Sequence, residues 1–197
     1  HARIVAARGA SGGRADDRDG RGGWGVTVSR WDHRPWKPVD QGDGTCFVPL
    51  TQGKHSILDA DDARLIVRPW FAAHIEKLWY AHSNVNGKTK KLHRVILGLT
   101  DTSIDIDHED GDGLNNRRSN LRVCTHAQNM ANRSKNALSS SKYKGVCNRD
   151  GRWTAQIQVA GIKQYLGSFD SEEDAARAYN YAALRLSGKF ARINNEL

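Results

Sequence analysis

Residues 104–133 carry the pattern that most restricts how this chain can fold. The first four of them alternate isoleucine with aspartate, which predicts a strand that brings Asp107 and His108 to its end. A polar loop rich in glycine and asparagine follows, and the alternation over 121–125 predicts a returning strand. A Thr-x-x-Gln capping box then opens a helix at His126. The order strand, loop, strand, helix confines many carboxylate, imidazole and amide groups to one small unit.

These side chains suit the hydrolysis of a phosphodiester bond. That reaction needs a base to activate water and a hard cation to neutralise developing charge. A neutral His108 is a suitable base, because the pKa of an unperturbed imidazole is about 6.5. Asp107 and the amide oxygen of Asn129 are ligands suited to Mg²⁺ or Mn²⁺. Asn129, Asn132 and Arg133 share one helical face, which is expected to look back at Asp107 and His108.

The overall charge indicates the kind of partner. The chain has 30 lysines and arginines against 22 aspartates and glutamates, and this net charge of +8 favours a polyanion such as nucleic acid. No apolar run approaches the roughly 18–20 residues of a membrane helix, so we expect an intracellular protein without a membrane partner. The 3 cysteines are odd in number and widely spaced, which argues against a disulfide framework and against a thiolate zinc site.

Changes in composition divide the chain into four parts. Glycines and scattered charges without periodicity predict a flexible tail over residues 1–44. A first folded region is expected over 45–135, and the polar, serine-rich stretch 136–141 is interpreted as a linker. A second folded region is expected over 142–197.

Turn signals within the first folded region predict two hairpins. One is expected over 47–59 around a Gln-Gly turn, and the other over 78–99 around an Asn-Gly turn. Between them, an acidic start followed by apolar residues predicts a short helix that ends before Pro69.

The second folded region shows three strand-like segments and a helix. The segments cover 143–148, 152–159 and 163–169, and the short turns between them predict an antiparallel meander. A capping box at Ser171, an acidic first turn and a stop at Gly188 predict the helix. The residues that recur at helical spacing and can lie on the sheet are Ala175, Tyr179, Ala182 and Leu186.

The segment 152–159 has one apolar and one polar face. Trp153 lies on the apolar face, where a place in the core is the simpler interpretation. The polar face carries base-reading chemistry, since glutamine pairs with adenine, arginine pairs with guanine, and a β-sheet can enter the major groove. Residues 142–163 hold five basic residues against one acidic residue, so the sheet is basic. An ordinary solvated face would show the same alternation.

The run from Asp107 to Asn129 resembles the ββα-metal core of phage-type HNH homing endonucleases. It contains Asp-His, Gly-Asp, Asn-Asn-Arg, Asn-Leu-Arg and Gln-Asn in the order of that family, with asparagine at the last position, where other members have histidine. The resemblance implies that His108 is the general base, that Asp107 and Asn129 bind one divalent metal, and that Asn120 holds the catalytic loop through backbone hydrogen bonds. It extends over residues 47–98, where we favour a structural role for His93. The arginines interpreted as phosphate contacts beside this site are Arg117, Arg118 and Arg133.

Residues 142–195 resemble a second family, the Apetala-two/ethylene-response-factor (AP2/ERF) DNA-binding domain. The segments YKGV, RWTAQI, YLGSF and EEDAARAYNYAA carry this likeness. It implies a three-stranded sheet packed on one helix, with the open sheet face in the major groove. Cys147 stands where plant members usually have arginine, so plant target sequences do not transfer. The contacts carried over by position are Lys144, Arg149, Arg152, Gln156, Gln158, Lys163 and Tyr165.

We therefore predict an α+β chain with a ββα-metal HNH core, N-terminal β-hairpins, and a three-stranded antiparallel sheet packed on one helix. The predicted function is a DNA endonuclease, as in homing endonucleases, acting on duplex DNA in the cytoplasm of a bacterial or phage-infected cell. Mg²⁺ is the expected cofactor with Mn²⁺ as the alternative, and neither zinc nor a small-molecule cofactor is expected. The protein is predicted to be a monomer or a weak dimer. Two alternatives stay open: a non-enzymatic DNA-binding regulator with a decayed nuclease unit, and an RNA-binding module.

Overall fold

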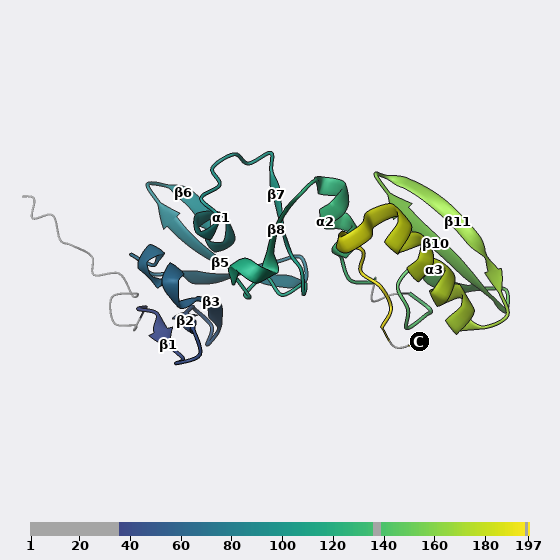
Figure 1. The fold of residues 1–197 in the computed structure, drawn as a ribbon, viewed down its shortest axis with the longest axis horizontal. Helices are drawn as coiled ribbons and strands as arrows, with labels where there is room; N and C mark the ends of the chain where they lie inside the picture. The colour runs from purple at the N-terminus through teal and green to yellow at the C-terminus, as the bar shows by residue number, and fades with distance from the viewer. Residues whose placement is uncertain (1–35, 136–138, 196) are drawn as a thin grey trace, which may run out of the picture. The chain divides into compact units, whose positions relative to one another are not determined.

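The computed structural model describes residues 36–135, 139–195 and 197, and all of these fall in one compact unit (Figure 1). The tail predicted over 1–44 therefore lies outside the described residues up to position 35. Its remaining part is not all tail, because Val39–Asp40 forms strand β1 and pairs antiparallel with β2 (Thr45–Pro49). Of the predicted linker, 136–138 also lies outside the described residues.

The first predicted hairpin is confirmed. β2 pairs antiparallel with β3 (His55–Asp59), and the Gln-Gly turn between them has positive φ at both residues. The short helix expected next is present as a 3-10 helix, η1 (Ala60–Leu65). The hairpin packs one face into the core, since Val48 and Leu58 are both fully buried.

The second predicted hairpin is confirmed in part. Strands β4 (Phe71–Ile75), β5 (Leu78–Val85) and β6 (Lys88–Lys91) form a sheet, and the Asn-Gly turn joins β5 to β6. The apolar run after β6 is not a strand but helix α1 (Leu92–Ile96), whose first and last residues lie one turn apart and are buried. β4 was not predicted, because its flanking turn lacks an Asn-Gly or Asp-Gly signal.

The strand, loop, strand, helix order of residues 104–133 is also confirmed. β7 (Asp105–His108) pairs antiparallel with β8 (Leu121–Cys124), after the short 3-10 helix η2 (Arg118–Asn120). Helix α2 (His126–Asn132) begins with the predicted reciprocal capping box. Ile106 of β7 and Leu121 of β8 share one apolar core with the two hairpins and α1. This core fixes β7 against the rest of the first folded region.

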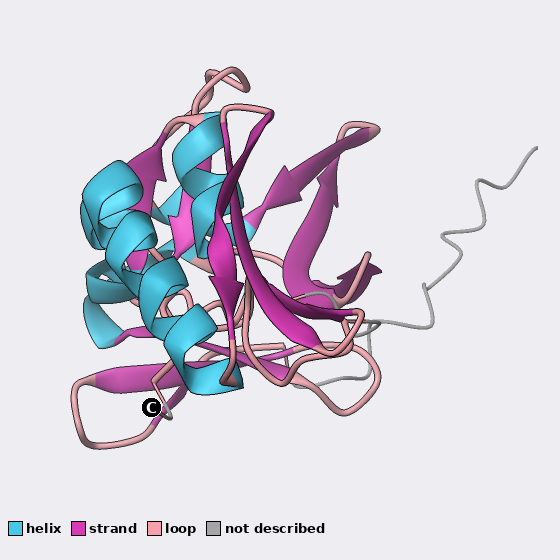
Figure 2. Cartoon of the chain, turned by 90° about the vertical axis from the view of Figure 1, so that its right-hand side faces the viewer, coloured by secondary structure: helices cyan, strands magenta, loops and turns pink. Residues whose placement is uncertain are grey.

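The second folded region is a three-stranded sheet with a helix on one face, as predicted (Figure 2). The strands are β9 (Val146–Arg149), β10 (Arg152–Val159) and β11 (Ile162–Phe169), and β10 lies in the middle. The helix is α3 (Glu172–Ser187), capped by Ser171 and followed by the 3-10 helix η3 (Gly188–Phe190).

The buried stripe of α3 differs from the predicted one in its last turn. Tyr179 and several alanines are buried against the sheet, but the buried residues end at Ala183 and Leu186 is 45% exposed. Trp153 packs beside the core, as interpreted from the sequence. The described part of the chain contains no helix long and apolar enough to span a membrane. Helix α3 has 16 residues, and three acidic residues lie in its first turn.

Two glycines of this region provide a test of its packing. Both have positive φ, but a Cβ at Gly145 would lie 2.0 Å from Tyr179 Cδ2, whereas a Cβ at Gly151 would meet nothing within 4 Å. We expect Gly151→Ala to cost about 1 kcal/mol through backbone strain alone. Gly145→Ala should cost about 1–3 kcal/mol more, because α3 must shift away from the sheet. Urea unfolding of both variants measures the difference, and equal losses would contradict the close packing described.

Candidate active site

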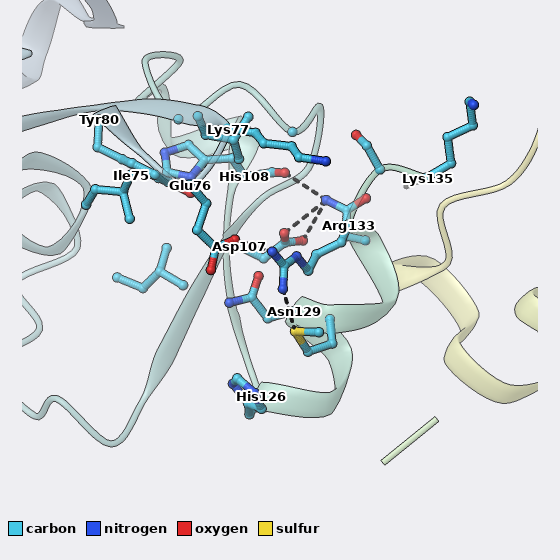
Figure 3. A pocket seen from close by; sticks show the side chains of 17 residues that line it. Ile75, Glu76, Lys77, Tyr80, Asp107, His108, His126, Asn129, Arg133 and Lys135 are labelled. Carbon is cyan, nitrogen blue, oxygen red and sulfur yellow. Dashed lines mark hydrogen bonds and ion pairs between the residues drawn. The ribbon is translucent and has the colours of Figure 1, made fainter. Parts of the chain in front are cut away.

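The end of β7 brings two polar side chains into a buried position. Asp107 is 4% exposed and His108 is 6% exposed, although both are polar and one is a carboxylate. Both line a cavity of about 710 Å³, together with Tyr80 from β5 and with Asn129 and Asn132 from α2 (Figure 3). Buried polar groups of this kind need partners that compensate for lost hydration.

Asp107 obtains those partners from β8 and α2. Arg122, directly opposite in the β7–β8 register, donates to Asp107 Oδ2 through Nε at 3.1 Å and through Nη2. Asn132 Nδ2 donates to Asp107 Oδ1 at 2.9 Å and to the His108 carbonyl at 2.8 Å. A carboxylate has about four acceptor positions. Among the described residues Oδ1 has one donor, so an acceptor position on that oxygen stays available for a ligand.

The imidazole of His108 is held by a hydrogen bond and by two neighbouring rings. Its Nε2 lies 3.3 Å from Asn116 Oδ1, and Asn116 Nδ2 donates to Ser56 Oγ at 2.7 Å. Because this bond commits Asn116 to offering its oxygen, the neutral imidazole carries its proton on Nε2 and presents Nδ1 as the acceptor. The rings of His93 and Tyr80 pack against His108 at centroid distances of 5.2 and 5.9 Å.

Burial also sets the charge state of this histidine. Loss of hydration lowers the pKa of His108, although the Asn116 hydrogen bond and nearby carboxylates oppose that effect. Burial lowers the pKa of His93 as well, to about 2, so the ring beside His108 stays neutral. An uncharged His108 next to the carboxylate of Asp107 is the arrangement that a general base beside a cation site requires.

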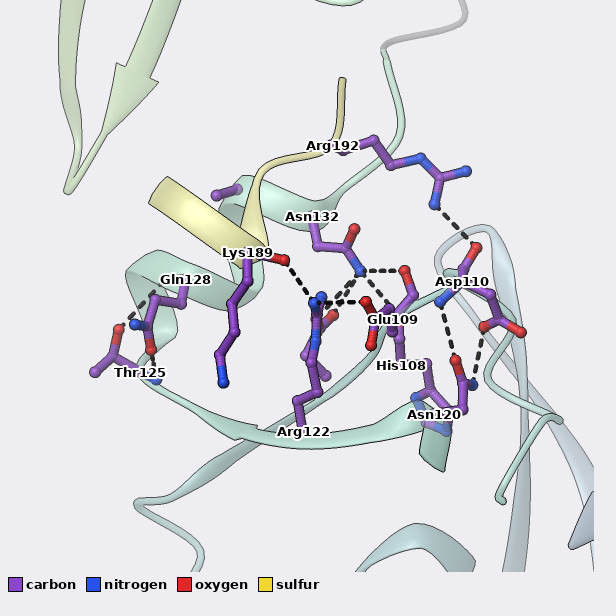
Figure 4. A network of polar contacts seen from close by, with 12 residues as sticks. His108, Glu109, Asp110, Asn120, Arg122, Thr125, Gln128, Asn132, Lys189 and Arg192 are labelled. Carbon is purple, nitrogen blue, oxygen red and sulfur yellow. Dashed lines mark hydrogen bonds and ion pairs between the residues drawn. The ribbon is translucent and has the colours of Figure 1, made fainter. Parts of the chain in front are cut away.

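Asn120 fixes the loop between β7 and β8. Its Oδ1 accepts from the Asp110 backbone N at 3.0 Å, and its Nδ2 donates to the Asn115 carbonyl at 2.8 Å (Figure 4). One side chain therefore joins two points of the loop that leaves His108. The loop cannot move independently of the start of β8.

The structure places Asn129 in the same cavity as Asp107 but gives it a different hydrogen bond. Asn129 Nδ2 lies 3.3 Å from Asp105 Oδ2, which also contacts His126 Nδ1 at 3.0 Å. The amide that contacts Asp107 is that of Asn132, one turn further along α2. No group of three or more His, Cys, Asp or Glu side chains suited to a metal occurs in the described ranges. One carboxylate and one amide oxygen fit a hard cation such as Mg²⁺, which usually keeps several waters.

The three arginines expected to contact phosphate make contacts within the protein. Arg118 forks onto the buried Asp62, with its Nε and Nη2 each 2.8 Å from a carboxylate oxygen. Arg117 Nε donates to Asn115 Oδ1 at 3.0 Å, and Arg133, half exposed at the cavity, pairs with Glu76. Arg118 therefore has a structural use, because it supplies the counter-charge that buried Asp62 needs.

Of the residues expected to contact bases, most lie on the open face of the sheet. β10 and β11 pair Gln156 with Tyr165 and Gln158 with Lys163, on the face opposite α3. Arg149 and Arg152 are paired across β9 and β10 and are both exposed.

Lys144 differs from these residues. Its Nζ donates to the Ala131 carbonyl at 2.5 Å, and burial lowers the pKa of Lys144 to about 8. Its ammonium group thus holds the end of α2 rather than standing on the open sheet face, where a DNA contact was expected.

Sequence reasoning missed two partners of the predicted catalytic pair. Arg122 was given no separate role from the sequence, yet the antiparallel register places it against Asp107. Asn116 was given no role beyond its place in the Asn-Asn-Arg step of the motif, yet it contacts His108 and is fully buried. The signal for Arg122 was its position on the returning strand, whereas the sequence held no separate signal for Asn116.

Comparisons with known proteins agree with the presence of two folded regions in this chain. A family model described as HNH endonuclease matches residues 90–131. An uncharacterized HNH endonuclease of Acanthamoeba polyphaga mimivirus is 36% identical over 127 residues, which cover 61% of this chain and 65% of that protein. The chain therefore spans less than two thirds of this relative.

Plant proteins match shorter stretches of the chain. An AP2/ERF and B3 domain-containing protein of Oryza sativa subsp. japonica is 51% identical over 59 residues, covering 29% of this chain and 16% of that protein. An AP2/ERF and B3 domain-containing transcription repressor of Arabidopsis thaliana is 40% identical over 73 residues, covering 36% and 20%. The chain therefore carries an HNH endonuclease domain joined to an AP2/ERF-like region.

Proposed function

We propose that the protein is a DNA endonuclease that hydrolyses a phosphodiester bond of duplex DNA. The observation that supports this best is the pair at the end of β7, where a neutral, buried imidazole and a carboxylate paired with Arg122 share one cavity. The HNH family match over residues 90–131 supports the same reaction class.

In the proposed mechanism, His108 Nδ1 takes the proton of the attacking water, while Asn116 holds the opposite nitrogen. Asp107 Oδ1 and Asn129 would hold one divalent cation, Mg²⁺ or Mn²⁺, which neutralises charge that develops on the phosphate and the leaving oxygen. Asn120 keeps the loop after His108 in place while the proton moves. The products would be a 5′-phosphate and a 3′-hydroxyl, and one site per chain favours a single-strand nick by a monomer or weak dimer.

The AP2/ERF-like region would select the target. Its open sheet face presents two glutamines, two arginines, a lysine and a tyrosine, which supply both phosphate and base contacts. A second cavity of about 890 Å³ is lined by Gln156, Gln158 and Lys163 and by Arg133, the residue that follows α2. A nuclease with its own reader fits a homing role inside a bacterial or virus-infected cell.

Nicking of supercoiled plasmid tests the catalytic assignment. We expect nicking with Mg²⁺ or Mn²⁺ that stops in EDTA, and a loss of about 10²–10⁴-fold in His108→Ala, because the base is removed. DNA binding should survive in this variant. His55→Ala is the matched control, since His55 is an exposed histidine that packs on Phe47. Intact binding with no metal-dependent nicking by the unaltered chain would favour the non-enzymatic regulator instead.

Two asparagines of α2 are expected to have different roles, Asn129 in metal binding and Asn132 in stability. Asn129→Ala should weaken Mn²⁺ binding by about tenfold or more while changing the free energy of unfolding little, if its amide oxygen is a ligand. Asn132→Ala should lower the free energy of unfolding by about 1–3 kcal/mol, because Asp107 and the His108 carbonyl lose a buried donor. Mn²⁺ titration followed by electron paramagnetic resonance and urea unfolding measure the two effects. Unchanged Mn²⁺ affinity in Asn129→Ala would remove Asn129 from the proposed site.

Salt dependence tests the proposed reader. Lys163→Ala should weaken duplex DNA binding and reduce the slope of log affinity against log salt by about 1, because one phosphate contact is lost. Arg177→Ala is the matched control, since Arg177 pairs with Asp174 on α3, which covers the other face of the sheet. Fluorescence anisotropy over a salt series gives both slopes. A structured RNA that competes better than duplex DNA would favour the RNA-binding alternative.

A further inference from the structure

The segment after α3 belongs to the AP2/ERF-like region in sequence and packs partly on it through Ala191, but it also contacts the nuclease domain. It covers 188–192, and its first three residues form η3. Phe190 is 6% exposed, although it follows a helix whose last turn is exposed to solvent. Figure 4 shows dashed lines that join Lys189 to Arg122 and Arg192 to Asp110.

One set of contacts is made to Arg122. The Lys189 carbonyl accepts from Arg122 Nη1 at 2.6 Å, and the Phe190 ring centroid lies 4.6 Å from the guanidinium carbon. Nε and Nη2 of the same guanidinium are the donors to Asp107. The side chain of Arg122 is 11% exposed, and Glu109 lies 3.4 Å from Nη1. The segment and the catalytic carboxylate thus hold opposite sides of one buried cation.

A second set of contacts is made to the loop that leaves His108. Arg192 Nη1 donates to the Asp110 carbonyl at 2.9 Å, and the Arg192 backbone N donates to the Ala131 carbonyl of α2 at 3.4 Å. The guanidinium passes over Gly111, where a Cβ would lie 2.6 Å from Arg192 Nη1 and φ is +81°. Only glycine permits this approach without a shift. The same loop residue, Asp110, is held from the other side by Asn120.

We infer that residues 188–192 are a positioning element of the nuclease site, which fixes Arg122, and through it the carboxylate of Asp107, as well as the loop after His108. This inference rests on the proposed function. A surface tether between two regions would contact whatever lay nearest. This segment instead contacts the partner of the carboxylate and the loop of the base. The two Arg122 donors on Oδ2 resist rotation of the Asp107 carboxylate and so keep the position of Oδ1 fixed.

The consequence is that an active nuclease needs the AP2/ERF-like region even when DNA binding is not limiting. Residues that orient a metal ligand without touching the metal typically change metal affinity or activity by about 10–100-fold. Loss of the Phe190 ring or of the Arg192 guanidinium should therefore lower both the Mn²⁺ affinity and the nicking rate. The affinity for DNA in EDTA should stay the same, because the open sheet face is untouched.

The test uses full-length variants. Phe190→Leu removes the ring but keeps an apolar side chain of similar size, and Phe190→Tyr keeps the ring. Arg192→Ala removes the guanidinium that donates to the Asp110 carbonyl. Arg185→Ala is its control, because it removes the same charge and Arg185 stacks on Tyr181 of its own helix. For each protein we would measure Mn²⁺ affinity without DNA by electron paramagnetic resonance, the single-turnover nicking rate, and DNA affinity in EDTA.

We expect Phe190→Leu and Arg192→Ala to lower the Mn²⁺ affinity and the single-turnover rate by about tenfold, with DNA affinity within about twofold of Arg185→Ala. Phe190→Tyr should recover most of both losses. Unaltered Mn²⁺ affinity and nicking in Phe190→Leu and Arg192→Ala would overturn the inference, and so would losses confined to DNA affinity or thermal stability. The proposed function fails separately, through full activity in His108→Ala. Mn²⁺ affinity still reports on the segment if no nicking is found.

Discussion

The ion pair between Asp107 and Arg122 is the interaction on which the site depends. An unpartnered carboxylate at this depth would lose several kcal/mol of hydration. Hydrogen bonds from Arg122 and Asn132 compensate for that loss at the cavity that Asp107 lines. The same pairing explains why β8 must lie beside β7, since the register that closes the sheet also brings the guanidinium to the carboxylate.

Local signals made the strand, loop, strand, helix unit predictable. Alternation fixed β7 and β8, and the capping box fixed the start of α2, because each depends on residues close in sequence. The same reasoning failed for α1, since a five-residue helix presents too little periodicity to be distinguished from a strand. It gave no sign that Arg118 and Lys144, which stay predicted DNA contacts, also bind the Asp62 carboxylate and the Ala131 carbonyl.

The site residues divide in the same way. The motif places Asp107, His108 and Asn120 at fixed spacing, so the sequence names all three as candidate site residues. Asn116 also stands in the motif, but its contact with His108 could not be predicted, because it depends on Ser56, 60 residues earlier, which accepts from the amide NH₂ and leaves the oxygen for His108. A proton position on His108 is therefore set by the first hairpin, a part of the chain that contributes no catalytic group itself.

This dependence on remote partners gives the arrangement of the domains a physical meaning. When a buried cation such as Arg122 is shared between Asp107 and the chain that follows α3, displacement of either side removes part of the hydrogen bonding that a buried charge needs. The cost of that displacement favours the geometry in which the HNH domain and the segment after α3 stay in contact.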